Sequence, residues 1–266
     1  MDADIAISPA IAPDVADGFF ETIDREIDRW AVFLDIDGTL IDLAATPDTI
    51  HVPPDLPAGL HGLSARLNGA LALVTGRALT YADGLFKPYR FPVAGLHGAE
   101  MRLGDGTMIA PPIPPEFSAL KIDLARNLSK VDGVLVEDKG GAIATHYRLA
   151  PHLEEAIGEI MRAYAEQAGE GYVLQLGKMV YEIRPAHSSK GDAVKRFLSE
   201  PMFAGRRALA IGDDLTDESM FSTVNALGGY SIRIGSAQVK TLAQARLPSP
   251  QAVRDAIALM ARTKTG

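Results

Sequence analysis

Carboxylates at the ends of two apolar runs are the residues of this sequence most suited to chemistry. Asp35 and Asp37 follow the first run and are separated by one residue, so extended backbone points both side chains to the same side. Carboxylates crowded in this way repel each other unless a cation or a proton lies between them. Asp213 and Asp214 follow the second run, level with Asp35. Three carboxylates that meet at one place suit the oxygen-preferring, octahedral ion Mg²⁺, and we predict a Mg²⁺ site there.

Two more acidic residues close to the second run have a different interpretation. Asp217 and Glu218 lie where a helical pattern begins, and acidic side chains at a helix start interact favourably with the helix dipole. The residue types alone therefore give these two no role beyond the helix start.

An anion site and a cation are predicted beside the carboxylates. The triplet TGR at 75–77 offers a hydroxyl and then backbone N–H groups that open a helix. Such a helix start binds phosphate, and a plain threonine cap is the alternative. Lys190 opens another helical stretch, where the helix dipole disfavours a cation. Its place makes sense if an anion and carboxylates lie nearby, and a solvated surface lysine is the alternative. Gly38 supplies the backbone freedom for a sharp turn after Asp37.

The polar clusters follow apolar runs that are typical of buried parallel strands. Each run ends abruptly at polar residues, and the runs alternate with helical patterns, which indicates a parallel sheet with helices on both faces. The predicted fold class is therefore α/β. Ligands of such sheets bind beyond the carboxyl ends of the strands, where all three polar clusters fall. The three runs with their polar ends are 31–35, 70–77 and 207–214.

A second, smaller domain is predicted between Thr75 and Lys190. That stretch is far longer than the ~30 residues of one strand–helix–strand crossover. It contains two helical stretches and two pairs of strands, which indicates an inserted α+β module. The predicted organisation is a loose tail and a short helix at 1–28, a core at 29–112 and 188–266, and the inserted module at 113–187.

Composition excludes several classes of protein. The 266 residues are 47% apolar and 23% charged, which is close to the globular average and excludes wholesale disorder. Cysteine does not occur in the sequence, so disulfides and thiolate metal sites are excluded. The net charge of −8 without a basic run argues against a nucleic-acid partner. No apolar run approaches the ~18 residues of a membrane span, and the acidic N-terminus differs from a signal peptide. We expect a cytoplasmic monomer without a membrane partner.

The order of the motifs resembles that of the haloacid dehalogenase (HAD) superfamily of phosphotransferases. DIDGT, a later strand-end Thr, a Lys and GDD follow one another along the chain. Within the superfamily, the sequence resembles the trehalose-6-phosphate phosphatases over nearly everything from about residue 30 to 235. The stretches that carry the resemblance are FLDIDGTL (33–40), TGR (75–77), GLHGAE (95–100), VEDKG (136–140), THYR (145–148), YEIRP (181–185), KG (190–191) and GDDLTDE (212–218).

The resemblance implies a Rossmann-like core and a role for each carboxylate. Asp35 would be the nucleophile that takes the phosphoryl group as an aspartyl phosphate, and Asp37 the general acid and then the general base. Mg²⁺ would be held by Asp35, Asp213 and Asp214, and by Asp37 through its backbone carbonyl. The other residues implied at the core site are Thr75 and Lys190 for phosphoryl stabilisation, and Gly38, Gly76, Arg77 and His97 for substrate contact.

The inserted module would be a cap that sets specificity for a small sugar phosphate. By resemblance, its sugar-contacting residues are Glu137, Lys139, Arg148 and Glu182. A carboxylate accepts hydrogen bonds from sugar hydroxyls, and a cation bridges hydroxyl and phosphate. Cross-strand charge pairs on a solvated sheet face are the alternative for all four. For His97 the alternative to a place at the site is a satisfied loop histidine.

The predicted reaction is the hydrolysis of trehalose 6-phosphate to trehalose and phosphate. The same chemistry on another sugar phosphate, such as sucrose phosphate or mannosyl-3-phosphoglycerate, is the nearest alternative, because specificity lies in the cap and not in the core. VEDKG and YEIRP favour trehalose. A catalytically dead binding domain would have no need to keep Asp35, Asp37, Lys190 and Asp213 together. A phosphomutase would need to retain its product sugar, which the sequence does not address.

Overall fold

The computed structural model describes residues 9–43, 50–177 and 179–262, and the chain divides into two compact units. We call Met1–Met108 with Ser189–Gly266 the core unit, and Ile109–Ser188 the cap unit. The predicted inserted module, 113–187, falls within the cap unit. None of the helices in the described ranges is long and apolar enough to span a membrane.

The described part of the core unit contains an eight-stranded sheet, and parallel pairing joins the strands from β14 to β4. Its central strand β2 (WAVFL) is buried at every position, as expected for a strand covered on both faces. In order across the sheet, the strands are β14 (Ala245–Leu247), β12 (Tyr230–Ile234), β11 (Arg207–Gly212), β2 (Trp30–Leu34), β3 (Leu71–Val74), β4 (Val93–Gly95), β5 (Glu100–Arg102) and β6 (Met108–Ile109). The prediction of a parallel sheet is confirmed for the six strands from β14 to β4. It missed the antiparallel edge, where β5 returns along β4 after a link too short for a crossover.

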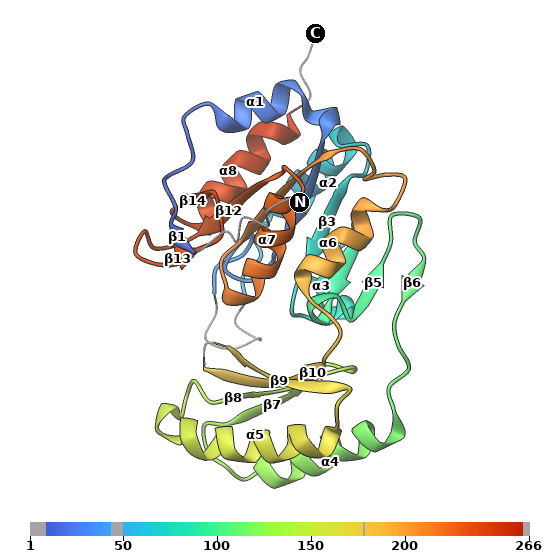
Figure 1. Ribbon diagram of the computed structural model, residues 1–266, viewed down its shortest axis with the longest axis vertical. Coiled ribbons are helices and arrows are strands. Elements are labelled where there is room, and N and C mark those ends of the chain that lie inside the picture. Colours follow the sequence, from blue (N-terminus) through green and yellow to red (C-terminus); the bar gives the residue numbers. More distant parts are fainter. Residues whose placement is uncertain (1–8, 44–49, 178, 263–266) are drawn as a thin grey trace, which may run out of the picture. The chain divides into compact units, whose positions relative to one another are not determined.

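Helices cover both faces of the core sheet, as predicted (Figure 1). The crossover from β2 to β3 runs through α2, and the crossover from β11 to β12 runs through α7 in the opposite direction along the sheet. Because such crossovers are right-handed, α2 and α7 lie on opposite faces. Helix α8 packs against α2 and α1, and α6 packs against α7. The core helices are α1 (Phe19–Arg25), α2 (Leu56–Arg66), α3 (Leu79–Leu85), α6 (Lys190–Leu198), α7 (Glu218–Ala226) and α8 (Pro250–Ala261).

The described part of the N-terminal segment is paired with the core. Strand β1 (Ala10–Ile11) pairs with β13 (Lys240–Thr241), and Asp14 forms a bridge and an ion pair with Arg246. The prediction of a loose tail is therefore wrong for residues 10–14, because backbone pairing and charge attach them to the edge of the sheet. Residues 1–8 of the predicted tail lie outside the described residues.

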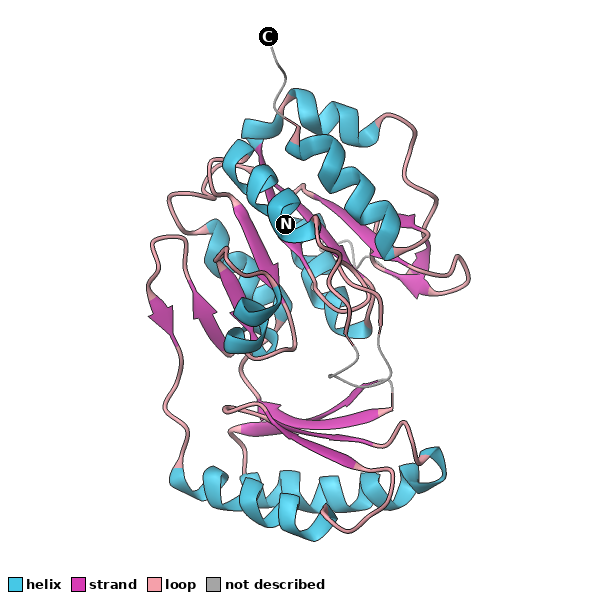
Figure 2. Cartoon of the chain, turned by 180° about the vertical axis from the view of Figure 1, so that it is seen from behind, coloured by secondary structure: helices cyan, strands magenta, loops and turns pink. Residues whose placement is uncertain are grey.

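The cap unit is a four-stranded antiparallel sheet with two helices packed on one face (Figure 2). The strands, in the order β7-β8-β10-β9, are β7 (Leu135–Asp138), β8 (Ile143–His146), β10 (Val180–Pro185) and β9 (Tyr172–Gly177), and the helices are α4 (Pro115–Leu128) and α5 (Glu154–Ala168). Apolar side chains between the helices and the sheet, including Phe117, Ile143, Met161 and Ile183, form the cap's own core. These helices and hairpins follow the predicted pattern.

Candidate active site

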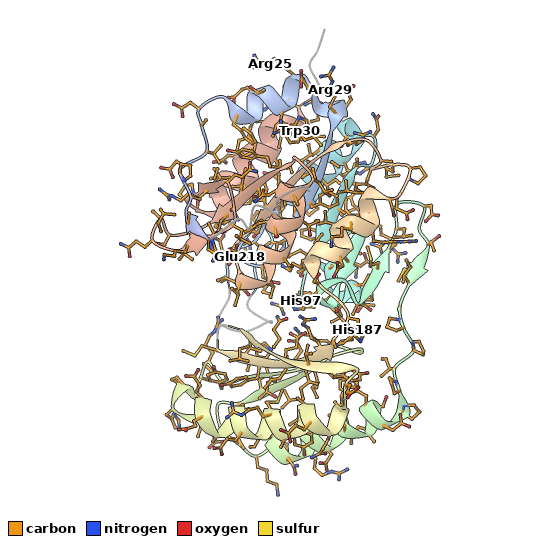
Figure 3. The ribbon with its side chains drawn as sticks, in the orientation of Figure 1. Arg25, Arg29, Trp30, His97, His187 and Glu218 are labelled. Carbon is orange, nitrogen blue, oxygen red and sulfur yellow. The ribbon has the colours of Figure 1, made fainter. Side chains whose placement is uncertain are left out.

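The site forms where the connections of the core sheet diverge. Strands β2 and β11 are parallel neighbours, and the Asp35 N–H donates to the Ile211 carbonyl at 3.0 Å. One crossover leaves this pair toward β3 and the other toward β12, which makes the carboxyl ends of β2 and β11 a topological switch point. Figure 3 marks Glu218, at the start of α7, at the opposite end of the core unit from Trp30, where β2 begins.

Three carboxylates converge at the carboxyl ends of β2 and β11. Asp35, Asp213 and Asp217 each offer one oxygen, and these oxygens lie within 4.8 Å of one another. Within the described ranges, Asp35 and Asp213 therefore come together as predicted from their strand-end positions. The third member is Asp217, for which the residue types alone predict only a place at a helix start. Such a cluster can hold a divalent metal ion.

Asp214, the predicted fourth ligand, has a different contact. Its carboxylate accepts from the Leu215 N–H at 2.7 Å and caps the short turn Leu215–Asp217. In return, the Asp217 carboxylate accepts from the Asp214 N–H at 2.9 Å. This reciprocal capping box folds Asp217 back toward the strand end. The D-x-x-D spacing of residues 214 and 217 is the sequence signal that could have identified it.

Lys190 lies among the carboxylates. Its Nζ donates to Asp35 at 2.5 Å and to Asp217 at 2.7 Å, and it is 3% exposed. Burial alone would lower the pKa of Lys190, but the Asp217 and Asp35 carboxylates more than offset this and raise the pKa above its ordinary value. Lys190 is therefore a permanent cation, and the alternative of a solvated surface lysine is wrong.

The carboxylates nevertheless outnumber their cation. Burial raises the pKa of Asp35 well above its ordinary value although Lys190 opposes the shift. Burial and the charge of Asp217 raise the pKa of Asp213 to about 7. Asp213 Oδ1 is buried and has no hydrogen-bond partner among the described residues. Asp213 therefore favours a bound proton or a cation beside it, as the sequence predicts for crowded carboxylates.

Two glycines let the loops approach this closely. Gly38 has a φ of +76°, and a Cβ there would collide with the Asp213 carboxylate. At Gly191, a Cβ would lie 2.5 Å from the Ser219 carbonyl oxygen. The missing side chain at Gly191 lets the start of α6 approach α7, and this contact places Lys190 beside Asp217.

The 75–77 turn begins where β3 ends. Thr75 is buried, and its hydroxyl accepts from the Arg77 N–H at 3.1 Å, so the threonine caps its own turn. The Arg77 guanidinium donates twice to the Asp37 carboxylate, both at 2.8 Å. The Asp37 carboxylate is thus paired with Arg77, whereas Asp35 and Asp217 are paired with Lys190. The sequence predicted substrate contact for Arg77 and did not predict its pairing with Asp37.

His97 lies against the same turn. It is buried and has a left-handed backbone with a φ of +58°. Its N–H donates to the Thr75 carbonyl at 2.9 Å, and a Cβ at Gly76 would lie 2.7 Å from its ring. Gly76 and His97 are therefore tightly packed beside Thr75.

The cap unit carries the other predicted site residues on its sheet and in the turns between the strands. Glu137 and Glu182 both pair with Ala144 in the strand register, which puts the two acids on one face. Lys139 Nζ donates to Glu182 at 2.7 Å, and His146 Nε2 lies 2.9 Å from the Glu137 carboxylate. Arg148 lies in the turn after β8. The predicted residues Glu137, Lys139 and Glu182 thus form a row of charged groups within the cap, as the charge-pair alternative also expects.

Known proteins similar to this chain point to one family. A family model described as Trehalose-phosphatase matches residues 33–251. A probable trehalose-phosphate phosphatase of Sinorhizobium fredii is 53% identical over 247 residues, which are 93% of each chain. Trehalose-6-phosphate phosphatase of Escherichia coli K12 is 42% identical over 209 residues, 78% of each chain.

Solved structures show the same fold. The C-terminal domain of C. albicans trehalose-6-phosphate phosphatase matches 95% of this chain and 98% of its own with a TM-score of 0.81 at 24% identity. The HAD phosphatase BT1666 of Bacteroides thetaiotaomicron matches 92% of this chain and 96% of its own with a TM-score of 0.57 at 20% identity.

Proposed function

This chain belongs to the trehalose-phosphatase family, and from that premise we propose that it is a Mg²⁺-dependent phosphatase that hydrolyses trehalose 6-phosphate to trehalose and phosphate. The observation that carries the proposal is the buried Lys190 between Asp35 and Asp217, next to an Asp213 oxygen without a partner among the described residues. Such a group of charges is costly to bury, and it serves a reaction that needs an ionised carboxylate beside an anionic substrate.

The residues at the site fit Mg²⁺. The donor set is made of carboxylate oxygens, and Mg²⁺ prefers such oxygen ligands over softer nitrogen and sulfur ligands. Asp213 Oδ1, which is buried and has no hydrogen-bond partner among the described residues, is available as a ligand atom. Asp35 and Asp213 would hold the ion with the Asp37 carbonyl, and Asp217 is the third carboxylate of the cluster. Asp214, which the sequence also predicted as a ligand, instead caps the Leu215 turn. When bound, Mg²⁺ neutralises charge on phosphoryl oxygens.

The Asp35 carboxylate supplies the nucleophile. A bond forms between its oxygen and phosphorus while the bond from phosphorus to the sugar oxygen breaks, which gives an aspartyl phosphate. Lys190 favours the ionised form of Asp35 against the effect of its burial and counters the charge of the phosphoryl group, with Thr75 and the backbone N–H groups of its turn as further donors. Asp37 gives a proton to the departing sugar oxygen. In the second step Asp37 takes a proton from a water, whose oxygen bonds to phosphorus while the bond from phosphorus to Asp35 breaks, so that phosphate leaves and the Asp35 carboxylate is restored. Arg77 holds both oxygens of Asp37 in the ionised form, so this bidentate pair must open before Asp37 can carry the proton for the sugar oxygen.

The cap residues Glu137, Lys139, Arg148 and Glu182 would recognise the sugar. The ionised carboxylates accept hydrogen bonds from hydroxyls, and the cations donate them. In this division the core unit performs the chemistry and the cap unit, 113–187 in the predicted boundaries, sets the specificity. The net charge of −8 supports a protein that acts without nucleic acid, and we place it as a monomer in the cytoplasm.

Phosphate release from a panel of sugar phosphates tests the proposal. The panel contains trehalose 6-phosphate, sucrose 6-phosphate, mannosyl-3-phosphoglycerate and glucose 6-phosphate, each with Mg²⁺ and with excess EDTA. We expect trehalose 6-phosphate to give the highest kcat/KM and EDTA to stop its turnover. A higher kcat/KM on another sugar phosphate would overturn the substrate, and full activity in EDTA would overturn the metal.

A further inference from the structure

We propose that Lys121 of α4 is a positioning residue for sugar recognition, which holds the turn that carries Lys139. The inference rests on the proposed function, because it assumes that Lys139 binds the sugar. It concerns contacts within the cap unit, and neither the sequence motifs nor the core mechanism uses Lys121.

Lys121 holds the turn on both sides of Lys139. Its Nζ donates to the Asp138 carboxylate at 2.6 Å and to the Gly140 carbonyl at 2.7 Å. The same Asp138 oxygen accepts from the Gly140 N–H at 2.8 Å, so one ammonium and one carboxylate close the turn. The Lys139 N–H donates to the Ala142 carbonyl at 3.0 Å. The backbone of Lys139 is thereby fixed from before and after, and its Nζ extends to Glu182 at 2.7 Å.

Lys121 occupies a place where packing would favour an apolar residue. It lies in the buried stripe of α4 with Phe117, Leu124 and Leu128, the spacing of a core-facing helix surface. Its side chain is 8% exposed, whereas that of Asp138 is 60% exposed. Burying an ammonium costs free energy, and a well-packed apolar side chain of similar volume is often as stable or more stable. A charge at this position therefore points to a role that apolar packing cannot fill.

That role is the placement of Lys139. A lysine side chain has four rotatable bonds, and its end is well placed only if its backbone is fixed. With the turn loosened, the Lys139 ammonium would be held by Glu182 alone and would meet the sugar in more orientations. Lys121 thus acts through Lys139 and does not need to touch the substrate.

Lys121→Met is the variant that tests this, because methionine keeps the apolar stem and removes the ammonium. We expect kcat/KM for trehalose 6-phosphate to fall about 10-fold, mainly through KM. Hydrolysis of p-nitrophenyl phosphate, which has no sugar, should stay near the wild-type rate. Asp138→Ala, a change at an exposed side chain, should reproduce the same selective loss and guards against a folding defect in Lys121→Met.

A double-mutant cycle with Lys139→Met separates positioning from a general structural role. If Lys121 acts through Lys139, the double variant should lose no more than Lys139→Met alone. Additive losses, or equal losses on both substrates, would overturn the inference. Tyr164→Phe is the matched control. It removes a hydrogen bond of 2.6 Å to Asp123 that joins α5 to α4 in the same unit, and it should lower the Tm without raising KM.

The cycle also separates this inference from the proposed function. If wild-type protein hydrolyses trehalose 6-phosphate and Lys139→Met impairs it while Lys121→Met does not, only the role of Lys121 fails. If wild-type protein does not hydrolyse trehalose 6-phosphate, the proposed function fails first.

Discussion

At the level of single residues, the buried Asp35 and Asp217 and the half-buried Asp213 lie together beside the single cation of Lys190, and this imbalance decides how the site responds to pH. Burial, the largest cause, and Asp217 raise the pKa of Asp213 to about 7. A carboxyl whose folded pKa lies above its unfolded value stabilises the fold most at pH values below the unfolded pKa. The stabilisation is lost as the pH rises through the folded pKa. Without metal, the protein should therefore lose stability between about pH 4 and about pH 7.

A bound Mg²⁺ ion would replace that missing proton. We predict that Mg²⁺ raises the Tm more at pH 8 than at pH 5, measured by thermal unfolding against an EDTA-treated sample. Asp213→Asn should remove most of the difference, because its amide neither titrates nor repels Asp217. An equal Mg²⁺ shift at both pH values in the wild type would contradict this reading of the cluster.

Asp217 and Asp214 provide a second prediction, because the sequence and the structure rank them differently. Asp217→Asn removes a charge that contacts Lys190 at 2.7 Å. We expect it to lower kcat by about 10- to 100-fold, the usual effect of losing a partner that orients a site. Asp214→Asn keeps an oxygen that can cap the Leu215 turn and should cost only a few-fold. Steady-state kinetics of both variants decide the order, and a larger loss for Asp214→Asn would reverse it.

The sequence was sufficient for the residues that leave strands directly. Asp35, Thr75 and Asp213 follow apolar runs, so their common edge could be inferred from the rule for parallel sheets. Asp217 could not be placed in this way, because its position depends on a capping box one turn beyond the strand. The pairing of Arg77 with Asp37 was missed because, in a site with several acidic and basic side chains, residue types alone do not determine which of them form ion pairs.

At the level of elements, the contact between α6 and α7 is what brings Lys190 to the carboxylates. Lys190 and Asp35 lie 155 positions apart in the chain, so no local pattern predicts their distance. The helical stretch that Lys190 opens was predicted and is α6, and Ser189 caps it by accepting from the Asp192 N–H. What the sequence did not show is that Gly191 must lack a side chain for the two helices to meet.

Gly191→Ala tests this contact. The added Cβ would push the start of α6 away from Ser219, and we expect a loss of about 1–3 kcal/mol in the free energy of unfolding. Because Lys190 moves with it, kcat should fall by at least about 10-fold. Gly84→Ala in α3 is the matched control. A Cβ at Gly84 meets nothing within 4 Å, so helix propensity should leave stability equal or raise it. Denaturant unfolding and kinetics of both variants provide the comparison, and unchanged kcat in Gly191→Ala would contradict the proposed role of the contact.

At the level of the whole molecule, the two units divide the work in the proposed function. The sequence predicted two domains because one stretch was too long for a crossover, and the family resemblance is confirmed by the matches across most of the chain. The antiparallel edge of the core sheet and the pairing of residues 10–11 with β13 were beyond reach, since short strands carry little periodicity.

Glu182→Gln tests the division of work. We expect kcat/KM for trehalose 6-phosphate to fall roughly 10- to 150-fold, because a charged hydrogen-bond acceptor is lost. This corresponds to about 1.5–3 kcal/mol of transition-state stabilisation. The loss on p-nitrophenyl phosphate should be much smaller, since that substrate has no sugar to contact the cap. The ratio of the two kcat/KM values is the quantity to measure. Equal losses would assign Glu182 to the chemistry or the fold.

The most direct measurement of the central claim is the detection of a phosphoryl group on Asp35. Protein mixed with trehalose 6-phosphate and Mg²⁺ is quenched in acid within one turnover, digested and analysed by mass spectrometry. We expect a phosphoryl adduct on the peptide that contains Asp35, and neither adduct nor turnover in Asp35→Asn, which should remain folded. Turnover of trehalose 6-phosphate by Asp35→Asn, or an adduct on another residue, would contradict the proposed mechanism.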